Sequence, residues 1–109
     1  MKHSLLTTLV MAAAVMQATV AAAASTGAAD AGAGRRRAAV CFACHGEQGV
    51  SLVPGTPHLG GQDRGYLESA LRAYRDGQTR QNPVMNAMAK PLSDPDIANI
   101  AAYFSLQKR

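Results

Sequence analysis

The sequence predicts a small all-α domain with long loops, and three observations lead to this fold class. Apolar residues recur at three- and four-residue steps in the C-terminal half of the chain, which is the spacing of an amphipathic helix. No segment alternates apolar and polar residues over a useful length, so no strand is expected. With 109 residues the chain has room for one small domain, and no internal repeat is visible. We expect three to five helices.

Residues 1–24 differ in composition from the rest of the chain. They hold a long apolar run behind a single formal charge, Lys2, and they end in small residues, the last of which is Ala24. This arrangement is typical of a secretory signal peptide, and we expect cleavage after Ala24. A membrane anchor is less favoured because the run is shorter than the about 20 residues that a spanning helix needs. We therefore expect an exported, periplasmic protein with its domain at 25–109.

Local signals mark the ends of the first two expected helices. Asp30 is a candidate N-cap for a helix that runs through Arg37 to Val40. Residues 64–76 carry apolar residues on one helical face, and Gly77 follows them as a stop signal. That face consists of Tyr66, Leu67, Ala70, Leu71 and Tyr74.

The last helix is expected to begin after Ser93, which can cap it. Asp94 and Asp96 lie in its first turn, where the helix dipole favours negative charge, and Pro95 is tolerated there. Its apolar face consists of Ile97, Ile100, Ala101 and Phe104.

Two segments between the helices are expected to be irregular. Residues 46–62 contain five glycines and two prolines, which favours a long loop that is ordered around something. Residues 78–92 contain Asn82, Pro83 and Pro91, with two methionines in the middle.

The composition indicates a prosthetic group. Outside residues 1–24 the chain is poor in apolar side chains for its size, and it has no Trp. A core of this kind is marginal unless a disulfide, a metal or another group supports it. Because two cysteines form one bridge at most, a disulfide-dense scaffold is excluded.

The residues with distinctive chemistry are concentrated in the run Cys41-Phe42-Ala43-Cys44-His45. Two thiols one helical turn apart can add to the two vinyl groups of a haem, and the adjacent histidine then lies under the iron. We therefore expect one haem c, attached covalently through Cys41 and Cys44, with His45 as an iron ligand.

Three other interpretations of the motif are less favoured. A thiol-disulfide oxidoreductase places its Cys-x-x-Cys at the end of a strand in a βαβ unit, which this sequence lacks. A structural zinc site needs four ligands, and only His58 remains to complete the motif. A disulfide across two intervening helical residues has poor geometry.

The sixth position of such an iron has several candidate occupants. Met85, Met88 or His58 could ligate it, or it could be open. A methionine suits electron transfer, because it raises the reduction potential and blocks the iron to small molecules. Methionines also fill gaps in cores, so spacing alone does not choose between the two. An open position would make the protein a five-coordinate haem module that binds a small gas or peroxide.

From about Asp30 to Lys108 the chain resembles class I cytochromes c, most of all the small bacterial proteins called cytochrome c4 and cytochrome c-553. The resemblance implies a class I cytochrome c fold, with three to five helices and long loops wrapped around one covalently bound haem. The segments that carry it are CFACHG at 41–46, PHLGGQ at 57–62, YLESALRAYRDG at 66–77 and MNAMAKPLSDPDIANIAAYFS at 85–105.

The resemblance also implies roles for particular residues. In similar proteins the first methionine of the Met-x-x-Met pair is the distal iron ligand, which points to Met85. Pro57 matches a proline whose carbonyl accepts a hydrogen bond from the haem histidine, here His45. Cytochrome c4 carries two such domains in tandem, whereas this chain has one. The implied function is that of an electron carrier, not an enzyme.

The expected partners are redox proteins: a membrane or periplasmic reductase as donor, and a terminal oxidase or another reductase as acceptor. Neither nucleic acid nor a small-molecule substrate is expected, and the protein is expected to be a monomer. Its formal net charge is a modest +4, yet Arg35, Arg36 and Arg37 are consecutive. This run is either a solvated helix face or a basic patch that steers the protein toward an acidic docking surface.

Overall fold

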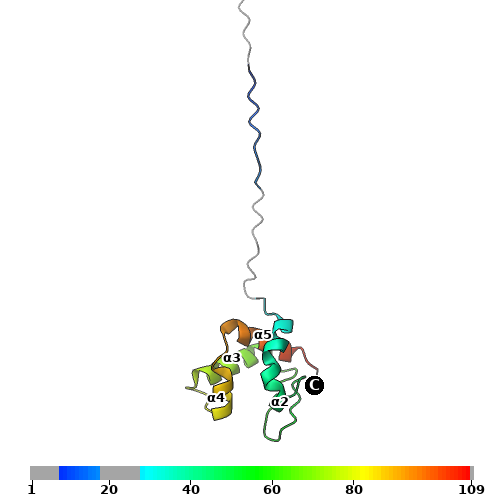
Figure 1. Cartoon of the computed structure of the whole chain (residues 1–109), viewed down its shortest axis with the longest axis vertical. Helices are drawn as coiled ribbons and strands as arrows, with labels where there is room; N and C mark the ends of the chain where they lie inside the picture. Colours follow the sequence, from blue (N-terminus) through cyan, green and yellow to red (C-terminus); the bar gives the residue numbers. More distant parts are fainter. Residues whose placement is uncertain (1–7, 18–27, 109) are drawn as a thin grey trace, which may run out of the picture.

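The computed structural model describes residues 8–17 and 28–108 (Figure 1). Residues 8–17 are exposed and have no regular secondary structure. The expected cleavage position at Ala24 and most of the expected signal peptide lie outside the described residues. In the described part, no helix is long and apolar enough to cross a membrane.

The segment from residue 28 to residue 108 is helical, as the sequence predicts, and contains no strand. The first three helical elements follow one another without a break, so the Cys-x-x-Cys-His motif ends a continuous helical segment. In chain order the elements are α1 (Ala31–Arg37), the 3-10 helix η1 (Ala38–Cys41), α2 (Phe42–His45), α3 (Arg64–Asp76), α4 (Pro83–Ala89) and α5 (Asp94–Ser105).

Local signals mark most of the helix ends, although the first helical segment, expected to reach Val40, continues to His45. The side chain of Asp30 caps α1 by accepting two backbone N–H groups, and Asp63 caps α3 in the same way with one. Gly77 ends α3 in the left-handed conformation, with a φ of 74°, which glycine adopts without steric strain. Ser93 and Asp96 form a capping box at the start of α5.

The prediction that residues 78–92 are irregular was wrong, because they contain α4. Asn82 caps this helix by accepting hydrogen bonds from the N–H groups of Val84 and Met85. Pro83 is its first residue, a position where the fixed φ of proline suits a helix and its missing N–H is not needed. The Asn and Pro that suggested a loop are thus the start signal of a short helix.

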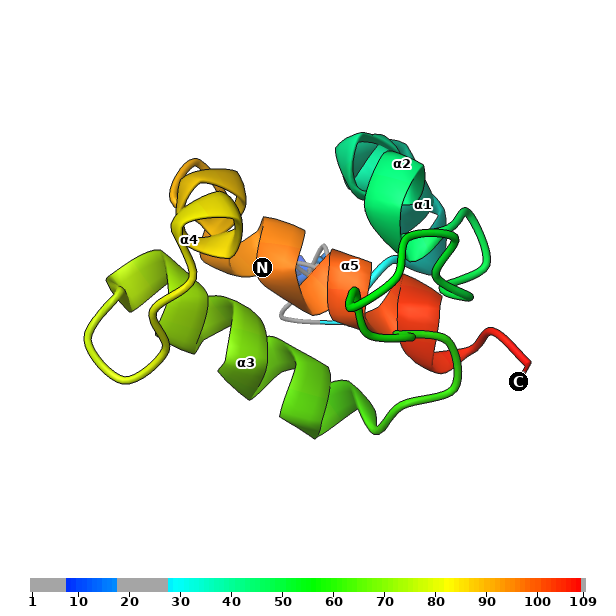
Figure 2. The ribbon, with the colours of Figure 1, turned by 90° about the horizontal axis from the view of Figure 1, so that it is seen from below.

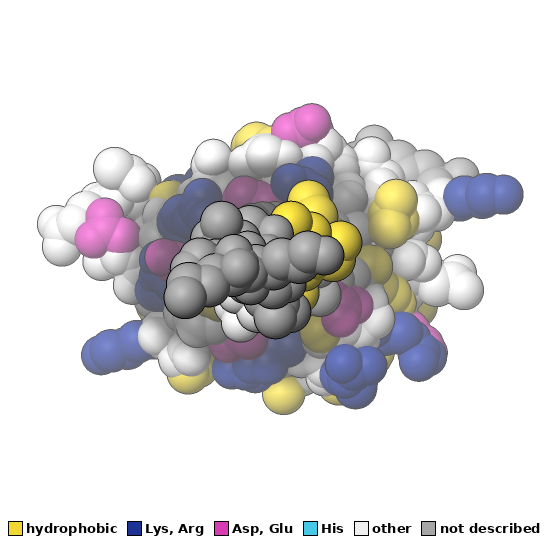
Figure 3. All heavy atoms as spheres, turned by 90° about the horizontal axis from the view of Figure 1, so that it is seen from above, with side chains coloured by type: hydrophobic (Ala, Val, Ile, Leu, Met, Phe, Trp, Pro, Cys, Tyr) yellow, Lys and Arg dark blue, Asp and Glu magenta, His cyan; other side chains and the backbone are white. Residues whose placement is uncertain are grey.

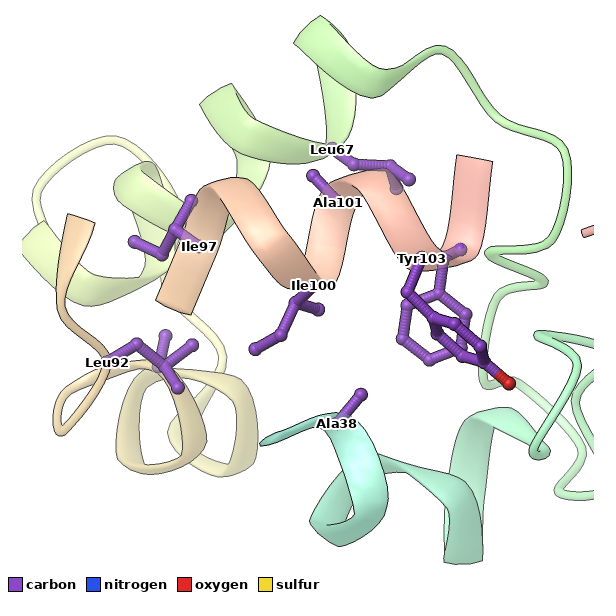
Figure 4. Close-up of a cluster of buried hydrophobic side chains, with 9 residues drawn as sticks. Ala38, Leu67, Leu92, Ile97, Ile100, Ala101 and Tyr103 are labelled. Carbon is purple, nitrogen blue, oxygen red and sulfur yellow. The ribbon is translucent and has the colours of Figure 1, made fainter. Parts of the chain in front are cut away.

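Helix α5 forms the centre of the domain (Figure 2). It packs against α1 and against α3, and α4 packs against α3. Side chains of α5 make up about half of the buried core, with Leu67 of α3 and Ala38 of η1 facing them (Figure 4). The whole cluster consists of Ala38, Leu67, Ala89, Leu92, Ile97, Ile100, Ala101, Tyr103 and Phe104.

Helices α1 and α5 approach each other closely at Gly34. A Cβ atom at this position would lie 1.9 Å from the backbone oxygen of Asn99, so only glycine fits. Farther along α5, the rings of Phe42 and Phe104 meet edge to face, with their centroids 6.4 Å apart. These contacts set the position of the motif-bearing segment relative to α5.

Candidate haem-binding site

Among the described residues, His45 is the only buried polar side chain, at 7% exposure. Its Nδ1 lies 2.9 Å from the carbonyl oxygen of Pro57, which is the contact expected of that proline. Because a carbonyl only accepts, Nδ1 donates the proton, and in the neutral ring Nε2 keeps its lone pair. Nε2 has no hydrogen-bond partner in the described part of the chain, and no side-chain nitrogen there is both unpartnered and buried. Nε2 therefore retains accessible surface. The ring is thus oriented as a metal-binding histidine requires.

The loop between α2 and α3, which presents this carbonyl, is held by backbone hydrogen bonds. The carbonyl of Gly49 accepts from the N–H groups of Leu59 and Gly60, at 2.8 and 3.0 Å. The N–H of Gly61 donates to the carbonyl of Phe104 at 2.9 Å and so ties the loop to α5. The loop is therefore ordered, and it belongs to the framework that positions the histidine.

A cavity of about 550 Å³ lies beside the histidine. This volume is within the range of pockets that hold cofactors. Its wall includes Cys41, Cys44 and His45 of the motif together with Met85 and Met88 of α4. The fold therefore brings these sequence-predicted site residues from two distant segments to one cavity.

Most of the remaining wall is apolar, and about half of its residues come from the two amphipathic helices. The complete apolar face predicted for 64–76 lines the cavity. Three of the four residues predicted for the face of the last helix line it as well, namely Ile100, Ala101 and Phe104. The fourth, Ile97, is fully buried in the core instead. An apolar cavity with two thiols and a histidine on its wall fits the chemistry of a covalently attached haem.

Cys41 and Cys44 both line the cavity and form no disulfide with each other. Burial raises the pKa of the Cys41 thiol, whereas a disulfide oxidoreductase needs a thiol whose pKa is lowered. The described part also contains no group of three or more His, Cys, Asp and Glu side chains arranged to hold a metal ion. The geometry therefore does not favour the dithiol or the zinc interpretation of the motif.

The candidates for the sixth iron position are placed differently by the fold. Met85 and Met88 are both half-buried and both line the cavity. His58 is exposed and lies on a separate, smaller pocket, where its Nδ1 accepts a hydrogen bond from the N–H of Ser51 at 2.8 Å. The two methionines, not His58, are the side chains that the fold brings to the wall shared with His45.

The cavity wall also contains Arg80, which sequence reasoning missed. Its guanidinium lies over the rings of Tyr66 and Tyr74, at 5.6 and 5.3 Å from their centroids, and donates to the Tyr66 hydroxyl at 2.9 Å. Within the described residues it forms no ion pair with an acidic side chain. A cation without an acidic partner beside an apolar cavity is suited to a carboxylate of the ligand. Arg80 lies in the segment between α3 and α4, and it reaches the tyrosine rings because this segment folds back over α3. No local signal in the sequence predicts that path.

The basic run on α1 is partly neutralised within the chain. Arg35 pairs with Glu47, and Nε of Arg37 lies 3.3 Å from a carboxylate oxygen of Asp96. Arg36 has no acidic partner among the described residues. On the face seen in Figure 3, Lys and Arg side chains are spread among Asp and Glu side chains and are not gathered in one patch. The run therefore contributes less unpaired charge than its sequence suggests.

Comparison with known proteins decides the family. The family model for cytochrome c matches residues 29–106. The chain belongs to the cytochrome c family. Cytochrome c-554(548) of Halomonas halodenitrificans is 51% identical over 80 residues, which cover 72% of this chain and 96% of that protein. Cytochrome c4 of Pseudomonas aeruginosa is 47% identical over 78 residues, which cover 72% of this chain and 38% of that protein.

A solved structure supports the same assignment. The crystal structure of reduced recombinant cytochrome c4 from Pseudomonas stutzeri matches with a TM-score of 0.70 and 44% sequence identity, over 74% of this chain and 47% of that chain. The chain thus spans nearly all of the first relative and less than half of the cytochrome c4 proteins. The predicted class I cytochrome c fold and the resemblance to cytochrome c4 are confirmed.

Membership of the family also establishes the cofactor and the general function. The cytochrome c carries a haem c, attached covalently through Cys41 and Cys44, the cysteines of its Cys-x-x-Cys-His motif. It is an electron-transfer protein.

Proposed function

We propose that this cytochrome c is a periplasmic carrier of single electrons whose haem iron is ligated by His45 and Met85. The observation that carries the proposal is that Cys41, Cys44, His45 and Met85 line one apolar cavity. When bound there, the haem supplies an iron centre that alternates between the ferric and ferrous states. The protein's part is to hold both ligands through that change and to keep water away from the iron.

The residues around the cavity are suited to these tasks. The hydrogen bond from His45 to Pro57 restrains the imidazole ring and increases its basicity as a ligand. The apolar faces of α3 and α5 make a wall of low dielectric constant, which tunes the reduction potential. Arg80, whose guanidinium lies over two tyrosine rings, is available to a carboxylate of the haem.

Met85 is preferred to Met88 because the first methionine of the pair is the ligand in similar proteins. Both side chains line the cavity, so a spectroscopic test is required. The oxidised wild-type protein is expected to show a methionine–iron charge-transfer band, which Met85→Ala abolishes and Met88→Ala keeps. Loss of the band in Met88→Ala alone would move the ligand to Met88.

The attachment of the haem and the number of its protein ligands can be tested together. A pyridine haemochrome spectrum of protein made with cytochrome c maturation machinery is expected to show haem bound by two thioethers. Absence of such haem would overturn the proposal. A rapid carbon monoxide adduct of the native reduced protein would favour the alternative function, a five-coordinate haem module that binds a small gas or peroxide.

The proposed periplasmic location rests on residues 1–24, whose composition is that of a cleavable signal peptide. The exported protein is expected to begin at Ser25, and an intact mass that includes Met1 would contradict this. We propose that the carrier is a monomer that exchanges electrons with a reductase and with an oxidase or another acceptor. Cross-linking of the haem-loaded protein to periplasmic and membrane extracts would identify these partners.

A further inference from the structure

Helix α4 carries both methionines of the cavity, yet it has only seven residues. A helix of this length is not stable on its own, because too few hydrogen bonds offset the entropy lost in forming it. Contacts with the rest of the domain must therefore fix its position. Helix α4 packs against α3, and the polar part of that attachment is concentrated in one side chain, that of Asn86.

The amide of Asn86 connects α4 to two other segments. Its Nδ2 donates to the carbonyl of Tyr74 near the end of α3 at 2.8 Å, and to the carbonyl of Arg80 at 3.0 Å. Its Oδ1 accepts from the backbone N–H of Asn82 at 2.9 Å. Because one end of the amide meets two acceptors and the other end meets a donor, only one orientation of the amide satisfies all three partners.

Asn82 completes a reciprocal arrangement around Met85. Its side-chain Oδ1 accepts from the backbone N–H of Met85 at 3.0 Å, while its own backbone N–H is held by Asn86. The backbone of Met85 is therefore bonded to one asparagine and directly precedes the other. Moving Met85 away from the cavity by displacing α4 would break the two hydrogen bonds that Asn86 donates to Tyr74 and Arg80, whereas the bonds with Asn82 lie within the helix and its cap.

We propose that Asn86 is a positioning residue that holds Met85 in place at the haem iron and so limits how often that ligand dissociates. This inference rests on the proposed function, in which Met85 is an iron ligand. Asn86 is not among the residues that line the cavity, and it acts through the position of α4. Its role is therefore distinct from that of a ligand or of a residue that contacts the haem.

Added imidazole provides a suitable probe, because it binds the ferric iron only when Met85 has left. The apparent affinity for imidazole is then proportional to the population of the open form. Asn86→Ala removes the two hydrogen bonds that join α4 to Tyr74 and Arg80, together with the bond to Asn82 in the helix cap. It is expected to raise the apparent affinity of the oxidised, haem-loaded protein for imidazole about tenfold or more. Asn86→Asp keeps an acceptor for the N–H of Asn82 but loses the bonds donated to Tyr74 and Arg80. The apparent affinity of this variant for imidazole is therefore expected to rise as well. This second variant keeps the test available if Asn86→Ala does not accumulate.

Asn99→Ala is the matched control. Asn99 also connects two segments through its side chain, by accepting from the N–H of Asp30 at 2.8 Å, but it lies at the contact between α1 and α5 and does not line the cavity. Its loss is expected to lower thermal stability and to leave the imidazole affinity unchanged. A general loosening of the fold would raise the affinity in both variants, which would overturn the inference.

The experiment separates failure of the inference from failure of the proposed function. Met85→Ala must bind imidazole much more tightly than the wild type, and equal binding would mean that Met85 is not the ligand. If Met85→Ala binds tightly while Asn86→Ala and Asn86→Asp match the wild type, Met85 remains the ligand and the positioning role of Asn86 is overturned.

Discussion

The Nδ1 atom of His45 and the carbonyl oxygen of Pro57 lie 2.9 Å apart, twelve residues apart along the chain. This hydrogen bond joins the end of the haem-binding motif to a loop that is otherwise tied to α5. The carbonyl belongs to the backbone, so its position depends on the conformation of the loop and not on a side chain. Pro57 restricts that conformation because its ring fixes φ.

Replacing Pro57 with glycine should therefore loosen the contact with His45. Pro57→Gly is expected to lower the free energy of unfolding of the haem-loaded protein by about 1 kcal/mol, because it widens the unfolded ensemble. It should also speed the exchange of the His45 Nδ1 proton with solvent, as measured by NMR. Pro54→Gly, in the same exposed loop, is the control and should affect stability alone. Equal exchange rates in the two variants would contradict the role given to Pro57.

The close approach of α1 to α5 predicts a large difference between two glycines of the same helix. Gly34→Ala would place a Cβ 1.9 Å from the backbone oxygen of Asn99, and we expect it to lower the free energy of unfolding by about 3 kcal/mol. At Gly32 the nearest atom is a side-chain oxygen of Asp30 at 3.3 Å, which can yield slightly. Gly32→Ala should change stability by no more than about 1 kcal/mol. Guanidinium unfolding of the haem-loaded variants provides the comparison, and equal losses would contradict it.

Much of the fold was predictable because its determinants are local. The cap at Ser93, the stop at Gly77 and the apolar face of residues 64–76 are each encoded within a few turns of helix, and the structure has all three. The chemistry of the Cys-x-x-Cys-His run is equally local. The cavity beside that run is formed by residues from distant segments, so no local pattern in the sequence predicts it.

What could not be predicted depends on contacts between segments. Helix α4 is too short to show a period, although Asn82 followed by Pro83 could have been recognised as a cap and a first helical residue. The position of Arg80 follows from tertiary contacts with two tyrosine rings. The sequence also could not choose between Met85 and Met88 from spacing, because residues three apart on a helix lie on similar sides.

The capping box of α5 should make stability depend on acid. The backbone N–H of Ser93, together with Arg37, holds the pKa of Asp96 below its ordinary value. A carboxylate with a lowered folded-state pKa stabilises the protein fully above its unfolded pKa of about 3.9, and this stabilisation is lost as pH falls through the folded value. Asp96→Asn is therefore expected to lower the free energy of unfolding by about 1 kcal/mol near neutral pH, with a smaller difference from wild type at about pH 3.

Asp94→Asn is the matched control for this measurement. Asp94 lies in the same turn, and its hydrogen bond with Arg75 lowers its pKa, but its side chain is 71% exposed. Solvent screens such a pair, so the loss of stability should be smaller. Chemical unfolding of both variants at the two pH values provides the measurement. A difference between Asp96→Asn and wild type that does not shrink in acid would contradict the role of the carboxylate charge.

The position of Arg80 on the cavity wall predicts an effect on the haem's reduction potential. A positive charge near the iron favours the reduced state, so Arg80→Gln is expected to lower the potential. If Arg80 pairs with a haem carboxylate, its loss also raises the pKa of that carboxylate, and the reduction potential of the variant should rise more steeply than that of wild type as the pH falls.

Arg36→Gln is the matched control. It removes the same charge from an exposed residue of α1 that does not line the cavity, and it should leave the reduction potential and its pH dependence nearly unchanged. Potentiometric titration of the three proteins across the pH range tests this, and equal shifts in the two variants would contradict a specific role for Arg80.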